Sequence, residues 1–188
     1  SGENRSSRRR AAPSVSEATV PSLLGSKSGF QGHLMSLSPA MQKNLGLIVF
    51  RIDGDRDQSD AARAQRQELQ RRVAGLFGKV EIPAQDGFAH WEDDLFVYGA
   101  LHADRAQLEA RAQQFISAVA EASATVKEGW TSRPLSVSAC VVPPSDAAVA
   151  TSLARGIQGV ESAGITSAPG SICLATKDIG HQAENGQH

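Results

Sequence analysis

An unbroken apolar run at residues 45–52, LGLIVFRI, is the feature that most constrains the fold of this 188-residue chain. A strand buried on one face alternates apolar and polar side chains, whereas a strand covered on both faces is apolar almost throughout. The run is rich in Ile and Val, so it predicts a central strand of a sheet. The acidic segment Asp53-Gly54-Asp55 follows the run directly, and polar side chains are therefore expected where this strand ends.

Two further strands are predicted at residues 88–91 and 95–101. They flank the acidic triplet Glu92-Asp93-Asp94 closely enough to be the two arms of a β-hairpin. The triplet would then form the hairpin tip. We expect this hairpin to pair with the strand at 45–52.

Three amphipathic helices are predicted around these strands. The hydrophobic period becomes helical at 57–77, Asp104-x-x-Gln107 resembles a capping box that opens a second helix, and Ser145-Asp146 caps a third. Additional strands or extended segments are predicted at 79–83, 135–142 and 171–176. The order indicates an α/β (α+β) sandwich of ferredoxin-like kind, with a mixed central sheet and helices packed on it.

The chain divides into three parts. Residues 1–40 are rich in Ser, Gly, Pro and Arg without a sustained period, which predicts a disordered linker. Residues 41–178 are the domain, and 179–188 a flexible tail. Two apolar patches in the linker, at 20–24 and 30–37, are expected to dock on the domain or on a partner. Ser1-Gly2 resembles a cleavage scar, so we expect a piece of a longer protein.

Composition excludes several classes of function. Residues 1–44 carry six Lys/Arg against two Asp/Glu, and the rest thirteen against eighteen, so the domain is acidic and nucleic acid is not an expected partner. No run approaches the roughly 20 apolar residues that span a bilayer, so no direct membrane insertion is expected. Cys140 and Cys173 lie in predicted strands, which favours reduced apolar residues in a cytoplasmic protein. The five histidines lack ligand spacing, so neither a metal nor a cofactor is expected.

This order of elements resembles the GGDEF domain of bacterial diguanylate cyclases and, more distantly, the class III nucleotidyl cyclases built on the same palm. The resemblance covers residues 40–178. The family's D-x-D-x-F-K segment, its G-G-D-E-F signature and its V-S-I-G-x-A strand correspond to Arg51-Ile52-Asp53-Gly54-Asp55-Arg56, to Trp91-Glu92-Asp93-Asp94-Leu95 and to Val137-Ser138-Ala139-Cys140-Val141-Val142.

The departures from the family pattern predict a degenerate, inactive site. The resemblance implies a carboxylate that holds Mg²⁺ at the end of the first strand, where Arg51 supplies a cation. Asp94 stands in place of the family's metal-binding Glu. Trp91 and Glu92 fill the place of two glycines that let the backbone approach the nucleotide. The inhibitory R-x-x-D motif that binds cyclic di-GMP is also missing, since residues 82–85 are IPAQ.

Two interpretations remain open for the substituted residues. The degenerate nucleotide site comprises Arg51, Asp53, Asp55, Glu92, Asp93 and Asp94, and it is either a relic that binds a polar ligand or a cluster of ion pairs that replaces the lost metal. Trp91, beside His90, is either an anchor for a partner or packed locally on His90 or the preceding loop.

The resemblance leaves three hypotheses of function. The first is a catalytically inactive module that regulates or binds a protein partner, or a neighbouring domain of the same polypeptide, in a larger bacterial signalling, secretion, motility or exopolysaccharide protein. The second is a nucleotide sensor that binds GTP or cyclic di-GMP in an altered pocket. The third is an active enzyme with unusual metal binding. A homodimer is compatible with each of them.

Overall fold

The computed structural model describes residues 18–54, 59–125 and 135–175. Its core is a five-stranded sheet in the order β4-β5-β2-β6-β7. The strands are β2 (Leu45–Ile52), β4 (Gly87–Glu92), β5 (Leu95–Leu101), β6 (Val137–Val142) and β7 (Ile172–Leu174). All neighbours are antiparallel except β6 and β7, which are parallel. The predicted mixed sheet with packed helices is therefore confirmed.

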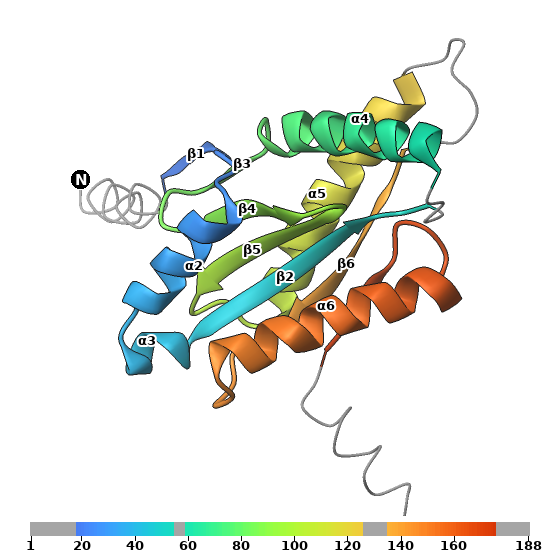
Figure 1. Cartoon of the computed structure of the whole chain (residues 1–188). Coiled ribbons are helices and arrows are strands. Elements are labelled where there is room, and N and C mark those ends of the chain that lie inside the picture. Colours follow the sequence, from blue (N-terminus) through green and yellow to red (C-terminus); the bar gives the residue numbers. More distant parts are fainter. Residues whose placement is uncertain (1–17, 55–58, 126–134, 176–188) are drawn as a thin grey trace, which may run out of the picture.

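Helices cover both faces of this sheet (Figure 1). On one face lie α4 (Asp60–Phe77) and α5 (Arg105–Thr125), and on the other lie α2 (Lys27–Ser36) and α6 (Val149–Thr166). The sheet thus forms the middle of three layers. No helix within the described ranges is long and apolar enough to cross a membrane.

β2 is the central strand, as its unbroken apolar run predicted. All eight of its residues are buried, and it pairs with β5 on one side and β6 on the other. Ile48 and Phe50 belong to the core beneath α4 and α5, whereas Leu47 and Val49 belong to the core beneath α2 and α6. Apart from Arg51, the strand is apolar because each face needs its own alternate set of side chains.

The core beneath α4 and α5 is built around six aromatic rings. Their neighbouring centroids lie 4.8–5.7 Å apart, the range of favourable offset and edge-to-face contacts. The rings are those of Phe50, Phe77, Phe88, Phe96, Tyr98 and Phe115. These rings pack α4 and α5 against strands β4 and β5, and this packing fixes the position of the hairpin.

The capping predictions have mixed outcomes. The capping box is confirmed, since the amide of Gln107 donates to Asp104 Oδ1 and the Gln107 side chain accepts from the Asp104 amide, both at 2.9 Å. Ser145 does not cap α6. Its hydroxyl accepts from Ala147 in a preceding turn at 3.2 Å, and the helix begins after Ala148 without a side-chain cap.

Residues 18–40 differ from the predicted disordered linker. β1 (Thr19–Pro21) pairs with β3 (Glu81–Pro83), and α2 follows it. The helical turn expected at Ser38-Pro39 is confirmed as α3 (Pro39–Gln42). Residues 1–17 and the tail from 179 lie outside the described ranges.

The linker prediction missed α2 because its sequence, KSGFQGHLMS, contains two glycines and polar residues of low helix propensity. Tertiary contact supplies what propensity does not. Phe30 and Leu34, one helical turn apart, are buried against the sheet. Docking of the 30–37 patch on the domain is therefore the alternative that the structure bears out.

Candidate functional site

Arg51 lies at the end of β2, where the resemblance places a metal-binding carboxylate. Its side chain is 8% exposed, and its Nε lies 3.4 Å from Asp94 Oδ2. At that distance the contact is an ion pair, and Nε makes no directed hydrogen bond. The guanidinium lies against α6, because a Cβ added at Gly164 would come within 2.5 Å of Nη1. A buried positive charge therefore occupies this strand end.

Asp53 is turned toward β6 and the segment that precedes β7. Its carboxylate accepts hydrogen bonds from the hydroxyls of Ser136 and Ser138, both at 2.7 Å, and from the amide of Gly170 at 3.0 Å. The Ser138 hydroxyl in turn accepts from the amides of Gly170 and Ser171. The carboxylate is thus held by three donors of the protein itself, which satisfy much of its capacity to accept.

Polar groups at the hairpin tip contact other residues of the same chain. Glu92 forms an ion pair with Lys27 of α2 at 2.6 Å. The ring of His90 stacks on Phe96 with centroids 4.6 Å apart, and its Nε2 lies 2.7 Å from the carbonyl oxygen of Asp93. Asp93 has φ 48°, a left-handed conformation that Asp tolerates in tight turns.

Trp91 is 7% exposed, so it is not a free aromatic at the tip. A register shift between His90 and Glu92 places it on the α2 side of the sheet. There it makes an edge contact with Phe30 at 6.3 Å, and Lys27 Nζ lies 4.9 Å from its ring centre. These contacts are with α2, a distant segment of the chain, rather than with His90 or the preceding loop that the packing alternative named.

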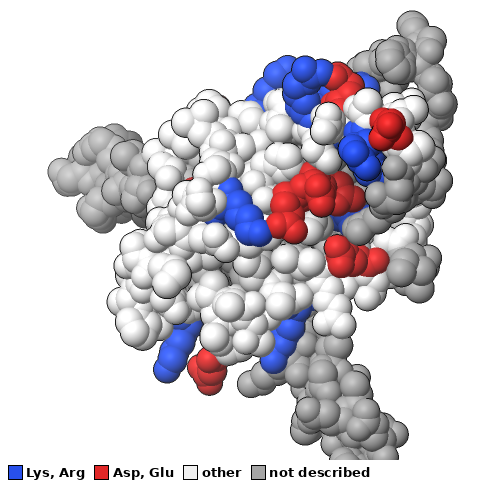
Figure 2. Space-filling view, viewed as in Figure 1, with Lys and Arg blue, Asp and Glu red and all other residues white. Residues whose placement is uncertain are grey.

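Four of the predicted site residues are therefore divided among three sets of contacts, while Asp93 contributes its carbonyl oxygen to the contact with His90. Arg51 and Asp94 come together, Asp53 joins the network around Ser138, and Glu92 pairs with α2. Asp55 lies outside the described residues. Within residues 18–54, 59–125 and 135–175, no group of three or more His, Cys, Asp or Glu side chains is placed to hold a metal ion. Figure 2, viewed as in Figure 1, shows acidic side chains near the centre of the visible face with basic side chains beside them.

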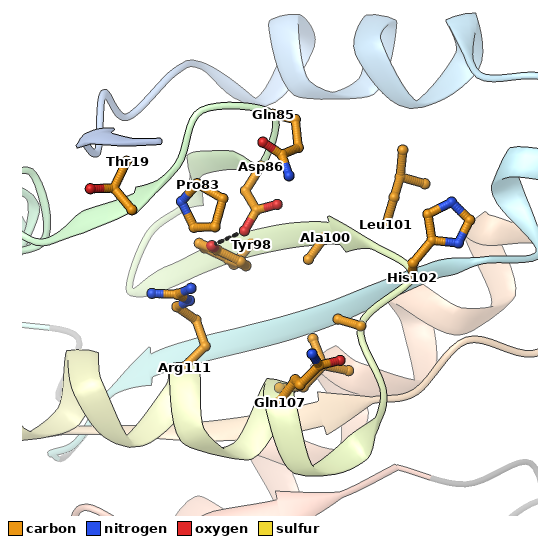
Figure 3. Close-up of a pocket in the computed structure, with 12 residues that line it drawn as sticks. Thr19, Pro83, Gln85, Asp86, Tyr98, Ala100, Leu101, His102, Gln107 and Arg111 are labelled. Carbon is orange, nitrogen blue, oxygen red and sulfur yellow. Dashed lines mark hydrogen bonds between the residues drawn. The ribbon is translucent and has the colours of Figure 1, made fainter. Parts of the chain in front are cut away.

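A pocket of about 310 Å³ lies elsewhere, between the start of the hairpin and α5 (Figure 3). Tyr98 donates a hydrogen bond to Asp86 at its wall, and Arg111 extends from α5 toward them. Burial raises the pKa of Asp86, although the Tyr98 hydrogen bond and the Arg111 charge oppose this rise. The pKa of Tyr98 is also raised, and burial is the largest cause. Pro83 and Gln85, from the 82–85 segment, also line the pocket.

No sequence motif indicates this pocket, because its polar residues come from separate segments. One signal was present in the sequence. Tyr98 is the single tyrosine of the chain and lies in the apolar run LFVYGAL, and a buried tyrosine hydroxyl usually needs a hydrogen-bond partner. That reasoning indicates a polar group near Tyr98, but it does not indicate Asp86 or Arg111.

No protein-family model and no curated protein matches the chain, whereas solved structures match its fold. The active GGEEF domain of a diguanylate cyclase from Vibrio cholerae is 15% identical with a TM-score of 0.63, over 82% of this chain and 99% of that one. The GGDEF domain of DgcB from Caulobacter crescentus, in complex with c-di-GMP, is 11% identical with a TM-score of 0.62, over 86% and 94%.

Diguanylate cyclase SiaD from Pseudomonas aeruginosa, in complex with its activator SiaC, is 11% identical with a TM-score of 0.59, over 93% of this chain and 68% of that one. At such low identities these matches show the fold alone. The chain has the fold of GGDEF domains, as the order of its elements and its hairpin predicted.

The Arg51–Asp94 pair generates a stability prediction. We expect Asp94→Ala to lower the free energy of unfolding by about 1–3 kcal/mol, since it leaves a buried guanidinium without its carboxylate. The double variant Arg51→Met, Asp94→Leu should recover most of that loss, because no charge is then left buried. Urea denaturation followed by circular dichroism measures both.

Glu68→Ala is the matched control for this prediction. Glu68 pairs with Arg71 on the exposed side of α4, so its removal should cost about 0.5 kcal/mol or less. An equal loss in Asp94→Ala and Glu68→Ala would contradict a structural role for the buried pair.

Proposed function

We propose that this chain is a catalytically inactive GGDEF-like module that regulates or binds a protein partner, as part of a larger bacterial signalling, secretion, motility or exopolysaccharide protein. The observation that carries the proposal is the buried Arg51 at the end of β2, paired with Asp94. Mg²⁺ requires oxygen ligands in near-octahedral geometry. A guanidinium supplies none and repels the ion.

The neighbouring carboxylates support the same conclusion. Asp94 is neutralised by Arg51, Asp53 is bound by two hydroxyls and an amide, and Glu92 is paired with Lys27. Phosphoryl transfer on metal ions depends on carboxylates that are free to coordinate and to face the triphosphate. These three carboxylates, of Asp53, Glu92 and Asp94, have protein partners instead.

The covered hairpin also argues against a cyclase. In the GGDEF family, paired glycines let the backbone approach the nucleotide. Here Trp91 and Glu92 occupy those positions, and α2 packs on them through Phe30 and Lys27. Main-chain pairing adds to this cover, since the amide of His90 donates to the carbonyl of Gly25 at 3.1 Å. A nucleotide at these positions would have to displace α2.

A role in protein binding draws support from two observations. SiaD, which shares the fold at 11% identity, forms a complex with a protein activator. In this chain Leu23 and Met35 are 85% and 81% exposed, and they belong to the two apolar patches expected to dock. Phe30 and Leu34 of the second patch pack against the sheet, whereas Leu23 and Met35 face solvent, where a partner can contact them. Large apolar side chains of this kind often anchor interfaces.

The first test of this proposal is turnover. We expect no pppGpG and no cyclic di-GMP after incubation with GTP and either Mg²⁺ or Mn²⁺, because the strand end carries a cation where the metal would bind. Liquid chromatography with mass detection measures both products. An active diguanylate cyclase assayed in parallel is the control, and product above the enzyme-free blank would sink the proposal.

The second test concerns the partner surface. A photo-crosslinking amino acid placed at Leu23 or at Met35 in the full-length protein, in its native cell, should give an adduct of discrete mass. The same amino acid at Glu121, which is exposed on α5, is the control and should give none. Adducts of equal yield at all three positions, or none at Leu23 and Met35, would remove this surface from the proposal.

The pocket favours a second candidate function, a sensor of GTP or cyclic di-GMP. It is lined by Pro83 and Gln85, in the segment where the resemblance places the cyclic di-GMP motif. Arg111 offers a guanidinium suited to phosphate, and the carboxylate of Asp86 can accept from the N–H groups of a guanine.

If this sensor function holds, nucleotide at 100 times its dissociation constant should add about 2.7 kcal/mol to the stability of the protein. Arg111→Ala should abolish that gain. Arg105→Ala should keep it, because Arg105 lies on the same helix but pairs with Glu109 at the exposed surface. Melting temperature with and without each nucleotide is the measurement, and an unchanged wild-type value would exclude this function.

A further inference from the structure

Two thiols lie side by side at the edge of the sheet. Cys140 of β6 and Cys173 of β7 are register partners in a parallel pair, and both are free. Neighbouring strands lie about 4.8 Å apart, and the Cα atoms of disulfide-linked cysteines are usually about 4.4–6.8 Å apart. The backbone spacing therefore already suits a covalent bond between them.

Both sulfur atoms are directed to the same place beneath α6. A Cβ added at Gly159 would lie 2.6 Å from Cys140 Sγ and 3.6 Å from Cys173 Sγ. The absence of a side chain at Gly159 leaves this space to the two sulfurs. Parallel partners project to the same face of a sheet, and here that face directs both sulfur atoms into the same space.

The two thiols differ in access and in acidity. Cys140 is fully buried on β6, between β2 and β7, whereas Cys173 is partly exposed on the edge strand. Hydrogen bonding by the neighbouring Cys140 thiol lowers the pKa of Cys173, and the same interaction together with burial raises the pKa of Cys140. Since the thiolate is the nucleophile, Cys173 is the one that meets an oxidant from solvent.

We propose that Cys140 and Cys173 are an oxidisable dithiol, a modification site for hydrogen peroxide or an organic peroxide. The Cys173 thiolate attacks one peroxide oxygen, the O–O bond breaks, and a sulfenic acid and a hydroxide (or alkoxide) result. The Cys140 sulfur then attacks the sulfenic sulfur. An S–S bond forms, the S–O bond breaks, and the Cys140 proton leaves with the hydroxyl as water. Two electrons pass from the pair of sulfurs to the peroxide.

Such a bond would fasten the C-terminal edge of the sheet. β7 has only three residues, and the residues just before it, Gly170 and Ser171, bind Asp53 and Ser138. A covalent link at Cys173 therefore holds the same segment that satisfies the Asp53 carboxylate. This inference does not depend on the proposed function.

Peptide mapping after peroxide treatment tests the proposal. In the wild-type protein we expect a cross-link between the peptides that contain residues 140 and 173, reversed by dithiothreitol, and slower hydrogen exchange at the Gly170 amide. In Cys140→Ser, the sulfenic acid should persist at Cys173 and be trapped by dimedone. In Cys173→Ser, dimedone should label nothing, because the remaining thiol is buried.

Several results would overturn the proposal. The first is that both thiols of the wild-type protein stay free although glutathione, added to the same tube as a control, is fully oxidised. The second is a disulfide that forms only between two molecules. The third is dimedone labelling of Cys140 rather than of Cys173. The wild-type cross-link alone decides the question if a serine variant does not fold, as judged by its melting curve.

Discussion

The burial of β2 on both faces is the condition on which the rest of the structure depends. Its side chains alternate between two separate cores, so the strand can lie only between two layers of helices and between two neighbouring strands. Arg51 is part of this strand and shares its burial. Removing a guanidinium from water is costly unless an opposite charge is close, and the hairpin turn supplies Asp94. The pairing of strand and hairpin thus brings the charge and its partner together.

In this arrangement, cations of the chain itself lie against the carboxylates of the hairpin tip. In a metal site, several carboxylates repel one another until a cation neutralises them. A cation carried by the chain itself does this without a bound ion. Asp94 and Glu92 each have an Arg or Lys partner, and Asp53 has hydroxyl and amide donors. Two of the three tip carboxylates are therefore neutralised locally, which is consistent with the ion-pair interpretation of these residues.

Sequence patterns predicted the elements whose signals are local. The apolar run of β2, the spacing of the hairpin arms and the Asp104–Gln107 capping box each follow from neighbours along the chain. Prediction was poorer where distant segments decide. α2 has weak helix propensity and forms on the sheet, and Trp91 is buried because α2 lies over it. The hydrogen bonds of Asp53 join residues more than 80 positions apart in the chain, a relation that no local pattern contains.

The glycines of α6 determine how closely this helix packs on the sheet. A Cβ at Gly156 would lie 2.7 Å from Val49 Cγ2 and 2.9 Å from Val142 Cγ2, and Gly159 and Gly164 lie just as close to the cysteine pair and to Arg51. The helix backbone thus rests directly on the side chains of the sheet, with no compressible layer between them. Its height above the sheet is set by the size of those few groups. A larger residue at any of these three glycines would therefore have to shift either the helix or the side chains beneath it.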